Sequence, residues 1–306
     1  MTDPGSTYHV PVLAERVLQA AGDARRVVDA TLGGGGHSAL FRERGMEVLA
    51  IDRDPDALRA ARARLGEQGI TYVEGAYGDD EALEAVARFH PDFILMDLGV
   101  SSHQLDREER GFSFRPGAPL DMRMGQAGET AADFLNDSSE QTLRAVFADY
   151  GDEPRAAALA REVVRRRQNE PFATSDHLVN AIRGVLGPRS GPGDFARLFQ
   201  AVRIAVNDEL EGLGRALPAF REALTPGAGG RLAVISYHSG EDRLVKHSMQ
   251  EWSRSCVCPP GAPLCTCRGR ALGRLEPRKP IRPDASEIAH NPRARSATLR
   301  IFLKAI

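Results

Sequence analysis

The fold of this chain is decided by Val27-Val28-Asp29-Ala30-Thr31-Leu32-Gly33-Gly34-Gly35-Gly36-His37-Ser38, followed by Val48-Leu49-Ala50-Ile51-Asp52. An apolar run ends in a carboxylate, turns through four glycines into a helical pattern, and leads to a second apolar run that also ends in a carboxylate. Glycine has no Cβ, so it accepts positive φ and lets the backbone approach a ligand closely. The stretch therefore predicts the strand-helix-strand start of a nucleotide-binding α/β fold.

The glycine spacing alone leaves the kind of nucleotide open. Gly34, Gly36 and Ala39, with Asp52 further on, fit the G-x-G-x-x-A pattern of NAD sites. However, a carboxylate at Asp29 would repel a pyrophosphate and attract a cation, by about 1 to 4 kcal/mol at 4 Å. S-adenosylmethionine carries an ammonium and a sulfonium and no phosphate, so we favour a methyl donor over NAD. The alternative is that Asp29 only caps the following turn.

Composition places the chain among ordinary globular proteins. It has 306 residues, of which 42% are hydrophobic and 27% charged, with a formal net charge of -2. The charge is uneven, because residues 251–306 hold 11 Lys and Arg against 4 Asp and Glu, which gives +7. This segment could hold a polyanion or be a solvated tail. Without a membrane-spanning apolar run, and with a short polar start at residues 1–8, we expect a cytoplasmic protein.

All four cysteines lie together, as Cys256-Val-Cys258 and Cys265-Thr-Cys267. Four thiolates could bind zinc. The C-x-C spacing is tighter than the usual C-x2-C, and no histidine completes the pattern, so an ordered loop without metal is the preferred interpretation.

Strand and helix patterns alternate up to residue 97. Strand patterns over 46–51, 70–74 and 92–97 alternate with helix patterns over 37–44, 55–65 and 79–89. The pattern over 92–97 is almost entirely apolar, as in a strand buried on both faces. We expect a mostly parallel, doubly wound sheet.

The alternation stops over 104–210, where a long loop precedes helix patterns at 130–135, 139–150, 153–168 and 175–185. Strand patterns resume at 231–236 and 296–303. We therefore expect a core formed by 1–103 and 211–306, and an inserted helical domain over 104–210 that serves as a lid or substrate platform. The loops at the carboxyl ends of the strands should line the ligand crevice.

Several longer motifs resemble the bacterial RsmH (MraW) family over nearly the whole chain. They are His9-Val-Pro-Val-Leu, Asp29-Ala-Thr-Leu-Gly-Gly-Gly-Gly-His-Ser, Asp97-Leu-Gly-Val-Ser-Ser-His-Gln-Leu-Asp, Arg110-Gly-Phe-Ser-Phe, Pro119-Leu-Asp-Met-Arg-Met, Phe199-Gln-Ala-Val-Arg-Ile-Ala-Val-Asn-Asp-Glu-Leu, Ile235-Ser-Tyr-His-Ser-Gly-Glu-Asp-Arg and Asn291-Pro-Arg-Ala-Arg-Ser-Ala. Tyr237 and Gly240 depart from the Phe and Leu that are common in the family.

The resemblance implies a class I S-adenosylmethionine-dependent methyltransferase with a Rossmann-like core and an inserted helical substrate-recognition domain. It also implies the reaction, methylation of N4 of a cytidine in 16S ribosomal RNA, near the decoding centre of the small subunit. The implied partner is that RNA and not a membrane. The oligomeric state stays open, with a homodimer as one possibility.

The same resemblance implies the cofactor-binding residues, which are Gly35, Gly36, His37, Asp52, Tyr77, Asp97 and Gln104. Backbone amides of Gly35 and Gly36 would meet the methionine carboxylate at a helix start. Asp52 would accept from the ribose hydroxyls, and Tyr77 would stack on adenine.

Asp97 is the first candidate to accept a proton of the cytosine amine, although a purely cofactor-binding role is an equal alternative. Asn207 and His238 are the next candidates for gripping the base, each with a structural alternative. Candidate phosphate contacts are Arg110, Arg115, Arg123, Arg293, Arg295 and Arg300.

Two other functions remain open at this level. One is a nicotinamide-dependent oxidoreductase that uses the same glycine turn, and NAD binding would identify it. The other is an RNA-binding or assembly protein without turnover, which a methyl-transfer assay would identify.

Overall fold

The computed structural model describes residues 11–101, 104, 107–225, 229–259, 264 and 266–305. The chain divides into two compact units. We call Met1–Gly99 with Leu210–Ile306 the core unit, and Val100–Glu209 the inserted unit. The start of the chain, with His9, lies outside the described residues, as do residues 102, 103, 105 and 106 in the motif that follows Asp97.

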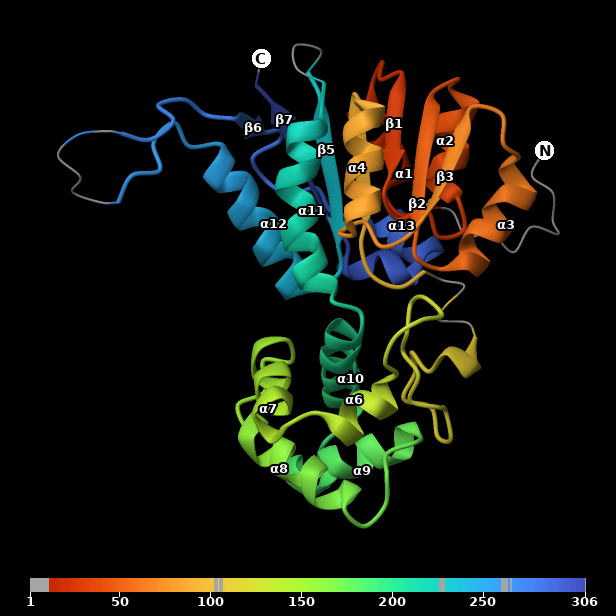
Figure 1. Ribbon diagram of the computed structural model, residues 1–306, viewed down its shortest axis with the longest axis vertical. Helices are drawn as coiled ribbons and strands as arrows, with labels where there is room; N and C mark the ends of the chain where they lie inside the picture. Colours follow the sequence, from red (N-terminus) through yellow and green to blue (C-terminus); the bar gives the residue numbers. More distant parts are fainter. Residues whose placement is uncertain are drawn as a thin grey trace. The chain divides into compact units, whose positions relative to one another are not determined.

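The core unit is built on a seven-stranded sheet in the order β3-β2-β1-β4-β5-β7-β6 (Figure 1). Its strands are β1 (Arg26–Asp29), β2 (Glu47–Asp52), β3 (Ile70–Glu74), β4 (Phe93–Asp97), β5 (Arg231–Ser236), β6 (Gly273–Leu275) and β7 (Thr298–Lys304). The first five strands are parallel, and β7 runs antiparallel to both of its neighbours. The expected doubly wound, mostly parallel sheet is confirmed. The sequence pattern did not predict β6 or the direction of β7.

Helices cover both faces of this sheet, because successive strand residues point to opposite sides. Val27 of β1 packs in one cluster, and its neighbour Val28 packs in another. The first cluster includes side chains of α1 (Ala14–Ala21), α2 (Gly36–Glu43) and α3 (Pro55–Leu65). The second includes α4 (Asp80–Phe89), α11 (Glu209–Ala223) and α12 (Ser239–Trp252), which Figure 1 shows on the other face. Near the end of the chain, α13 (Ala285–His290) and η2 (Pro292–Ser296) precede β7.

The inserted unit is helical and has its own core. It contains η1 (Glu108–Arg110), α6 (Ala131–Asp137), α7 (Glu140–Asp149), α8 (Ala156–Arg167), α9 (Ser175–Leu186) and α10 (Pro192–Val206). Leu143, Phe147, Leu159 and Leu198 are fully buried in it. The sequence pattern did not predict α10, which begins at a proline directly after Gly191. Proline suits the first helical position because that position needs no intrahelical donor.

None of the helices in the described parts of the chain combines the length and the apolar character needed to cross a bilayer.

Candidate functional site

Three aspartates end three neighbouring strands of the core unit. Asp29 ends β1, Asp52 ends β2 and Asp97 ends β4. These strands are parallel and adjacent in the sheet, so the three carboxylates lie along one edge. The carboxyl edge of a parallel sheet is where ligands bind in such folds.

Asp29 is almost completely buried, at 1% exposure. One carboxylate oxygen accepts from Ser38 Oγ at 2.7 Å, and the other accepts from the Thr31 amide at 3.4 Å. Burial raises the pKa of Asp29, and the nearby His37 opposes that rise. Asp29 therefore holds the two ends of the glycine turn together, which is the capping role that the sequence left as the alternative.

The glycine turn leads directly into α2. Gly35 has φ 73°, and a Cβ built on it would lie 3.0 Å from Leu65 Cδ1. A Cβ on Gly36 would lie 3.3 Å from Pro11 Cβ. The Gly35 amide donates to Leu32 O at 2.8 Å. That amide is thus used inside the turn, whereas Gly36 is the first residue of the helix. Contact of the Gly35 amide with a ligand carboxylate stays a prediction.

Asp52 binds the glycine turn to the start of α3. Its Oδ2 accepts from the Gly33 amide at 2.7 Å, and its Oδ1 accepts from the Asp54 amide at 2.8 Å. Burial is the largest influence on its carboxyl and raises its pKa to about 6. A carboxylate has about four acceptor positions, so both oxygens can still accept from a ligand hydroxyl.

Asp97 is held from three directions. Its amide donates to Thr31 Oγ1 at 2.6 Å, and its Oδ1 accepts from the Tyr237 hydroxyl at 2.8 Å. Its Oδ2 lies 3.6 Å from His37 Nε2. Burial first, and then the charge of Asp97, raise the pKa of Tyr237, so its hydroxyl stays protonated and donates. The carboxylate is therefore fixed in orientation.

His37 provides a test of whether this edge suits a polar ligand. Its side chain is buried, and among the described residues neither ring nitrogen has a hydrogen-bond partner. Buried polar atoms in native proteins almost always have partners. The imidazole, the tight glycine turn and the neighbouring Asp97 together fit a cofactor that offers polar groups at this point.

Tyr77 follows β3, where its loop packs tightly on α11. A Cβ on Gly78 would lie 2.6 Å from Gly212 Cα, and a Cβ on Gly212 would lie 3.6 Å from Tyr77 Cε2. Arg215 Nε also donates to Gly78 O at 3.1 Å. The two glycines thus let the loop approach the helix, and this contact sets the position of the Tyr77 ring.

His238 begins α12 and faces Glu241. Its Nδ1 accepts from the Glu241 amide at 3.4 Å, and its Nε2 lies 3.1 Å from Glu241 Oε1. Glu241, which is also buried, accepts from the Tyr237 amide at 2.8 Å. His238 thus caps the start of α12 through Nδ1, which favours its structural alternative, and among the described residues its buried Nε2 has no hydrogen-bond partner.

Gln104 and Asn207 belong to the inserted unit. Gln104 accepts from the Ser101 amide at 3.0 Å and donates to Met124 O at 3.1 Å. Asn207 accepts from the Met124 amide and donates to Met122 O, both at 2.8 Å. Its second donation goes to Arg203 O at 2.9 Å. Asn207 thus joins the 122–124 loop to α10, and these bonds favour its structural alternative.

The candidate arginines of the inserted unit differ in exposure. Arg110 donates to the carbonyl oxygens of Arg123 and Met124, and Arg123 makes a two-bond ion pair with Asp121. Arg110 and Arg123 therefore stabilise the conformation of the 121–124 loop. Arg115 pairs with Glu108, and its side chain is 69% exposed.

Near the C-terminus, Arg293 and Arg295 are exposed on η2. Arg300 is buried in β7 and pairs with Asp242 at 2.7 and 2.9 Å. Its expected phosphate contact is therefore wrong. Residues 251–306, which we call the basic segment, also contribute to a groove of about 690 Å³ beside α12 and β6. The lining of this groove includes Arg254, Arg274 and Arg278.

Sequence reasoning missed two side chains that matter here. Tyr237 was noted only as a departure from the Phe that is common in the family, yet its hydroxyl donates to Asp97, 140 residues away in sequence. Glu241 was missed although it stands three residues after the helix cap at His238, which is the spacing of a capping box.

Comparison with known proteins gives a consistent result. The sequence profile of the MraW methylase family matches residues 6–305. The ribosomal RNA small subunit methyltransferase H of Gemmatimonas aurantiaca is 58% identical, covering 98% of this chain and 96% of that protein. The protein of the same name from Rubrobacter xylanophilus is 47% identical, with the same shares covered.

Proposed function

Because the chain belongs to the MraW methylase family, we propose that it transfers the methyl group of S-adenosylmethionine to N4 of a cytidine in 16S ribosomal RNA, near the decoding centre of the small subunit. The coarser activity, S-adenosylmethionine-dependent methylation of small-subunit ribosomal RNA, is that of its named relatives. The observation that carries the finer proposal is Asp97, a fixed carboxylate at the end of β4 beside the glycine turn.

In this proposal the core unit binds the cofactor, which supplies an electrophilic methyl group on sulfur. The start of α2 at Gly36 favours an anionic group such as a carboxylate. His37 offers its unpartnered ring nitrogens, Asp52 accepts from ribose hydroxyls, and Tyr77 stacks on the adenine ring. Gln104 of the inserted unit is a further residue proposed to contact the cofactor.

Asp97 acts on the amine that receives the methyl group. The N4 lone pair is delocalised into the cytosine ring, so a hydrogen bond from N4–H to a carboxylate localises it. The bound cofactor would supply the methyl group and leave as a neutral thioether, and the proton lost from N4 would pass to the Asp97 carboxylate. The Tyr237 hydroxyl and Thr31 Oγ1 keep Asp97 in one orientation, and such positioning is a large term in a displacement reaction.

RNA recognition is assigned to exposed cations and to the inserted unit as the substrate-recognition domain. Arg115, Arg293 and Arg295 would contact phosphates, while Arg110 and Arg123 would support the loop. These contacts would offset the cost of unstacking the target base, which is a few kcal/mol. A protein that methylates ribosomal RNA in this way would act in the cytoplasm.

The decisive experiment supplies the purified chain with isotopically labelled S-adenosylmethionine and small subunits from a strain that lacks this methylation. Mass spectrometry of the digested RNA should show labelled N4-methylcytidine in one fragment at the decoding centre. Label on another atom or in another region would refute the finer proposal. Binding of NAD without binding of the methyl donor, or donor binding without transfer, would favour the alternative functions.

The role of Asp97 is tested by Asp97→Asn, which keeps the size of the side chain. We expect turnover to fall on the order of 100-fold or more, as when proton-accepting groups are removed, with a smaller change in cofactor affinity. Asp80→Asn, at an exposed site on α4, is the matched control. Equal losses in turnover and affinity would reduce Asp97 to a cofactor ligand.

A further inference from the structure

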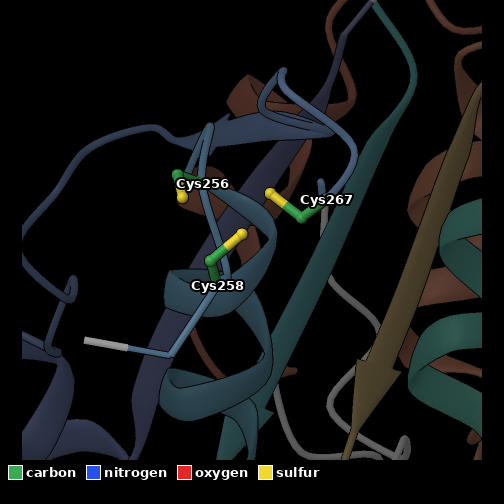
Figure 2. Close-up of side chains that lie close together, drawn as sticks. All are labelled: Cys256, Cys258 and Cys267. Carbon is green, nitrogen blue, oxygen red and sulfur yellow. The ribbon is translucent and has the colours of Figure 1, made fainter. Parts of the chain in front are cut away.

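Three cysteine side chains converge in the loop between α12 and β6. The sulfur atoms of Cys256, Cys258 and Cys267 all lie within 4.8 Å of one another, and the three thiols are not joined in disulfides. Figure 2 shows the three side chains close together, with the sulfurs of Cys258 and Cys267 directed toward each other. Residues from both sides of the loop thus meet at one point.

Hydrophobic burial does not account for this convergence. Cys256 is exposed, and Cys258 and Cys267 are half-buried. The nearby apolar side chains also face solvent, since Val257 is 38% and Leu264 is 73% exposed. The Val257 amide lies 3.3 Å from Cys267 Sγ and donates to it. A sulfur that accepts from a backbone amide is suited to the thiolate state that metal ions require.

We propose that Cys256, Cys258 and Cys267 bind one Zn²⁺ ion that serves a structural purpose. With Zn–S bonds of about 2.3 Å in a tetrahedron, neighbouring sulfurs lie about 3.8 Å apart. The observed arrangement needs about 1 Å of closure or less to reach that geometry. The fourth position is left unassigned, and Cys265 lies outside the described residues.

The charges of the loop suit this ion. Three thiolates and one Zn²⁺ carry a net charge of -1, and arginines stand close by in sequence at 254, 268 and 270. Arg268 is already held, because it pairs with Glu251 at 2.9 Å and donates to Arg254 O at 3.0 Å. The narrow C-x-C spacing in the sequence argued against a metal. That spacing could not show that the fold brings Cys267 close to Cys256 and Cys258.

The ion would fix the loop at its base. Arg254, two residues before Cys256, also lines the groove beside α12 and β6. A metal bound to the three thiols would therefore fix the loop directly after Arg254. None of the residues proposed for methyl transfer lies in the loop, so the site is separate from the reaction.

The test uses the full chain purified under reducing conditions, with Zn²⁺ and Co²⁺ alone as probes. Elemental analysis should find one zinc per chain. Replacement by Co²⁺ should give the near-ultraviolet absorption of cobalt–thiolate bonds. Cys256→Ser, Cys258→Ser and Cys267→Ser should each weaken binding on the order of 100-fold or more, because even loss of an outer partner costs about 10- to 100-fold. Ser255→Ala, an exposed neighbour in the same loop, should bind like the parent.

A second measurement separates metal loss from misfolding. Each serine variant should keep the cofactor affinity and the fluorescence of Trp252, because the loop is not part of the proposed cofactor site. Removal of the metal by a chelator should accelerate protease cleavage within residues 256–271 and not elsewhere. Absence of zinc together with absence of cobalt–thiolate absorption would overturn the proposal, and so would serine variants that bind metal as tightly as the parent.

Discussion

Gly78→Ala tests whether the close contact between the Tyr77 loop and α11 builds the cofactor site. The new Cβ would lie 2.6 Å from Gly212 Cα and 2.7 Å from Gly212 O. Carbon atoms pack best at about 3.5 to 4.0 Å, so the loop must move by about 1 Å. Gly78 is not among the glycines with positive φ, so the effect would come from contact and not from backbone strain.

The magnitude follows from overpacking, which costs about 1 to 3 kcal/mol. For a unit of this size, each kcal/mol lowers the melting temperature by about 2 to 4 °C. We therefore expect a decrease of about 4 to 8 °C for a cost of about 2 kcal/mol. Displacement of the Tyr77 ring should also remove its proposed stacking on the adenine ring, worth about 0.5 to 1.5 kcal/mol. That loss corresponds to an approximately 2- to 10-fold rise in the dissociation constant.

The assay follows Trp252, the chain's single tryptophan, which is buried against Phe302 of the core unit with ring centroids 5.2 Å apart. Its fluorescence reports unfolding of the core unit, and calorimetry reports binding of S-adenosylmethionine. Gly212→Ala is the matched control, because its Cβ would make only an ordinary contact of 3.6 Å with Tyr77. Alanine also favours a helix over glycine by about 1 kcal/mol. Gly78→Ala with the parent's stability and affinity, or Gly212→Ala with equal losses, would refute this reasoning.

Four other predictions concern charged groups. Because the pKa of Asp52 is raised to about 6, cofactor affinity should fall as pH drops below 6, and calorimetry should show that Asp52→Asn loses this dependence. Because the pKa of Asp52 is raised on folding, its contribution to the free energy of unfolding should fall as pH rises from 3.8 through about 6. Denaturant titrations should detect that loss in the parent but not in Asp52→Asn. Arg300→Met leaves Asp242 without its partner and should destabilise the core unit by about 3 kcal/mol in urea unfolding, whereas the double change Arg300→Met with Asp242→Leu should recover most of it. Arg293→Gln and Arg295→Gln should each weaken binding to ribosomal RNA and reduce the slope of log affinity against log salt by about 1, and an unchanged slope would remove that residue from the interface.

Much of the fold of the core unit was predictable from the sequence. The patterns over 55–65, 70–74 and 231–236 coincide with α3, β3 and β5. Short-range signals explain this success, as at α3, where Asp54 caps the helix through the Asp56 amide and Pro55 opens it. The three-residue strand β6 was not predictable, since it depends on pairing with β7.

The candidate site was predictable in part. The order of strands brings the ends of β1, β2 and β4 to one edge, so the positions of Asp29, Asp52 and Asp97 followed from the sheet class. The partners of each side chain did not follow. Asp29 and Asn207 looked available for a ligand, but both are bonded within their own units.

The sequence by itself determined the α/β class, the glycine turn and the acidic ends of the strands, because neighbours along the chain control strand and helix formation. Only the tertiary structure decided which distant groups meet. Tyr237 reaches Asp97, and Cys267 returns to Cys256 and Cys258, because the packing of strands and helices brings separate segments together. The physical reason is that a local pattern specifies which face a residue occupies, whereas a hydrogen bond or a metal ligand also needs a partner placed within a few ångströms by the whole fold.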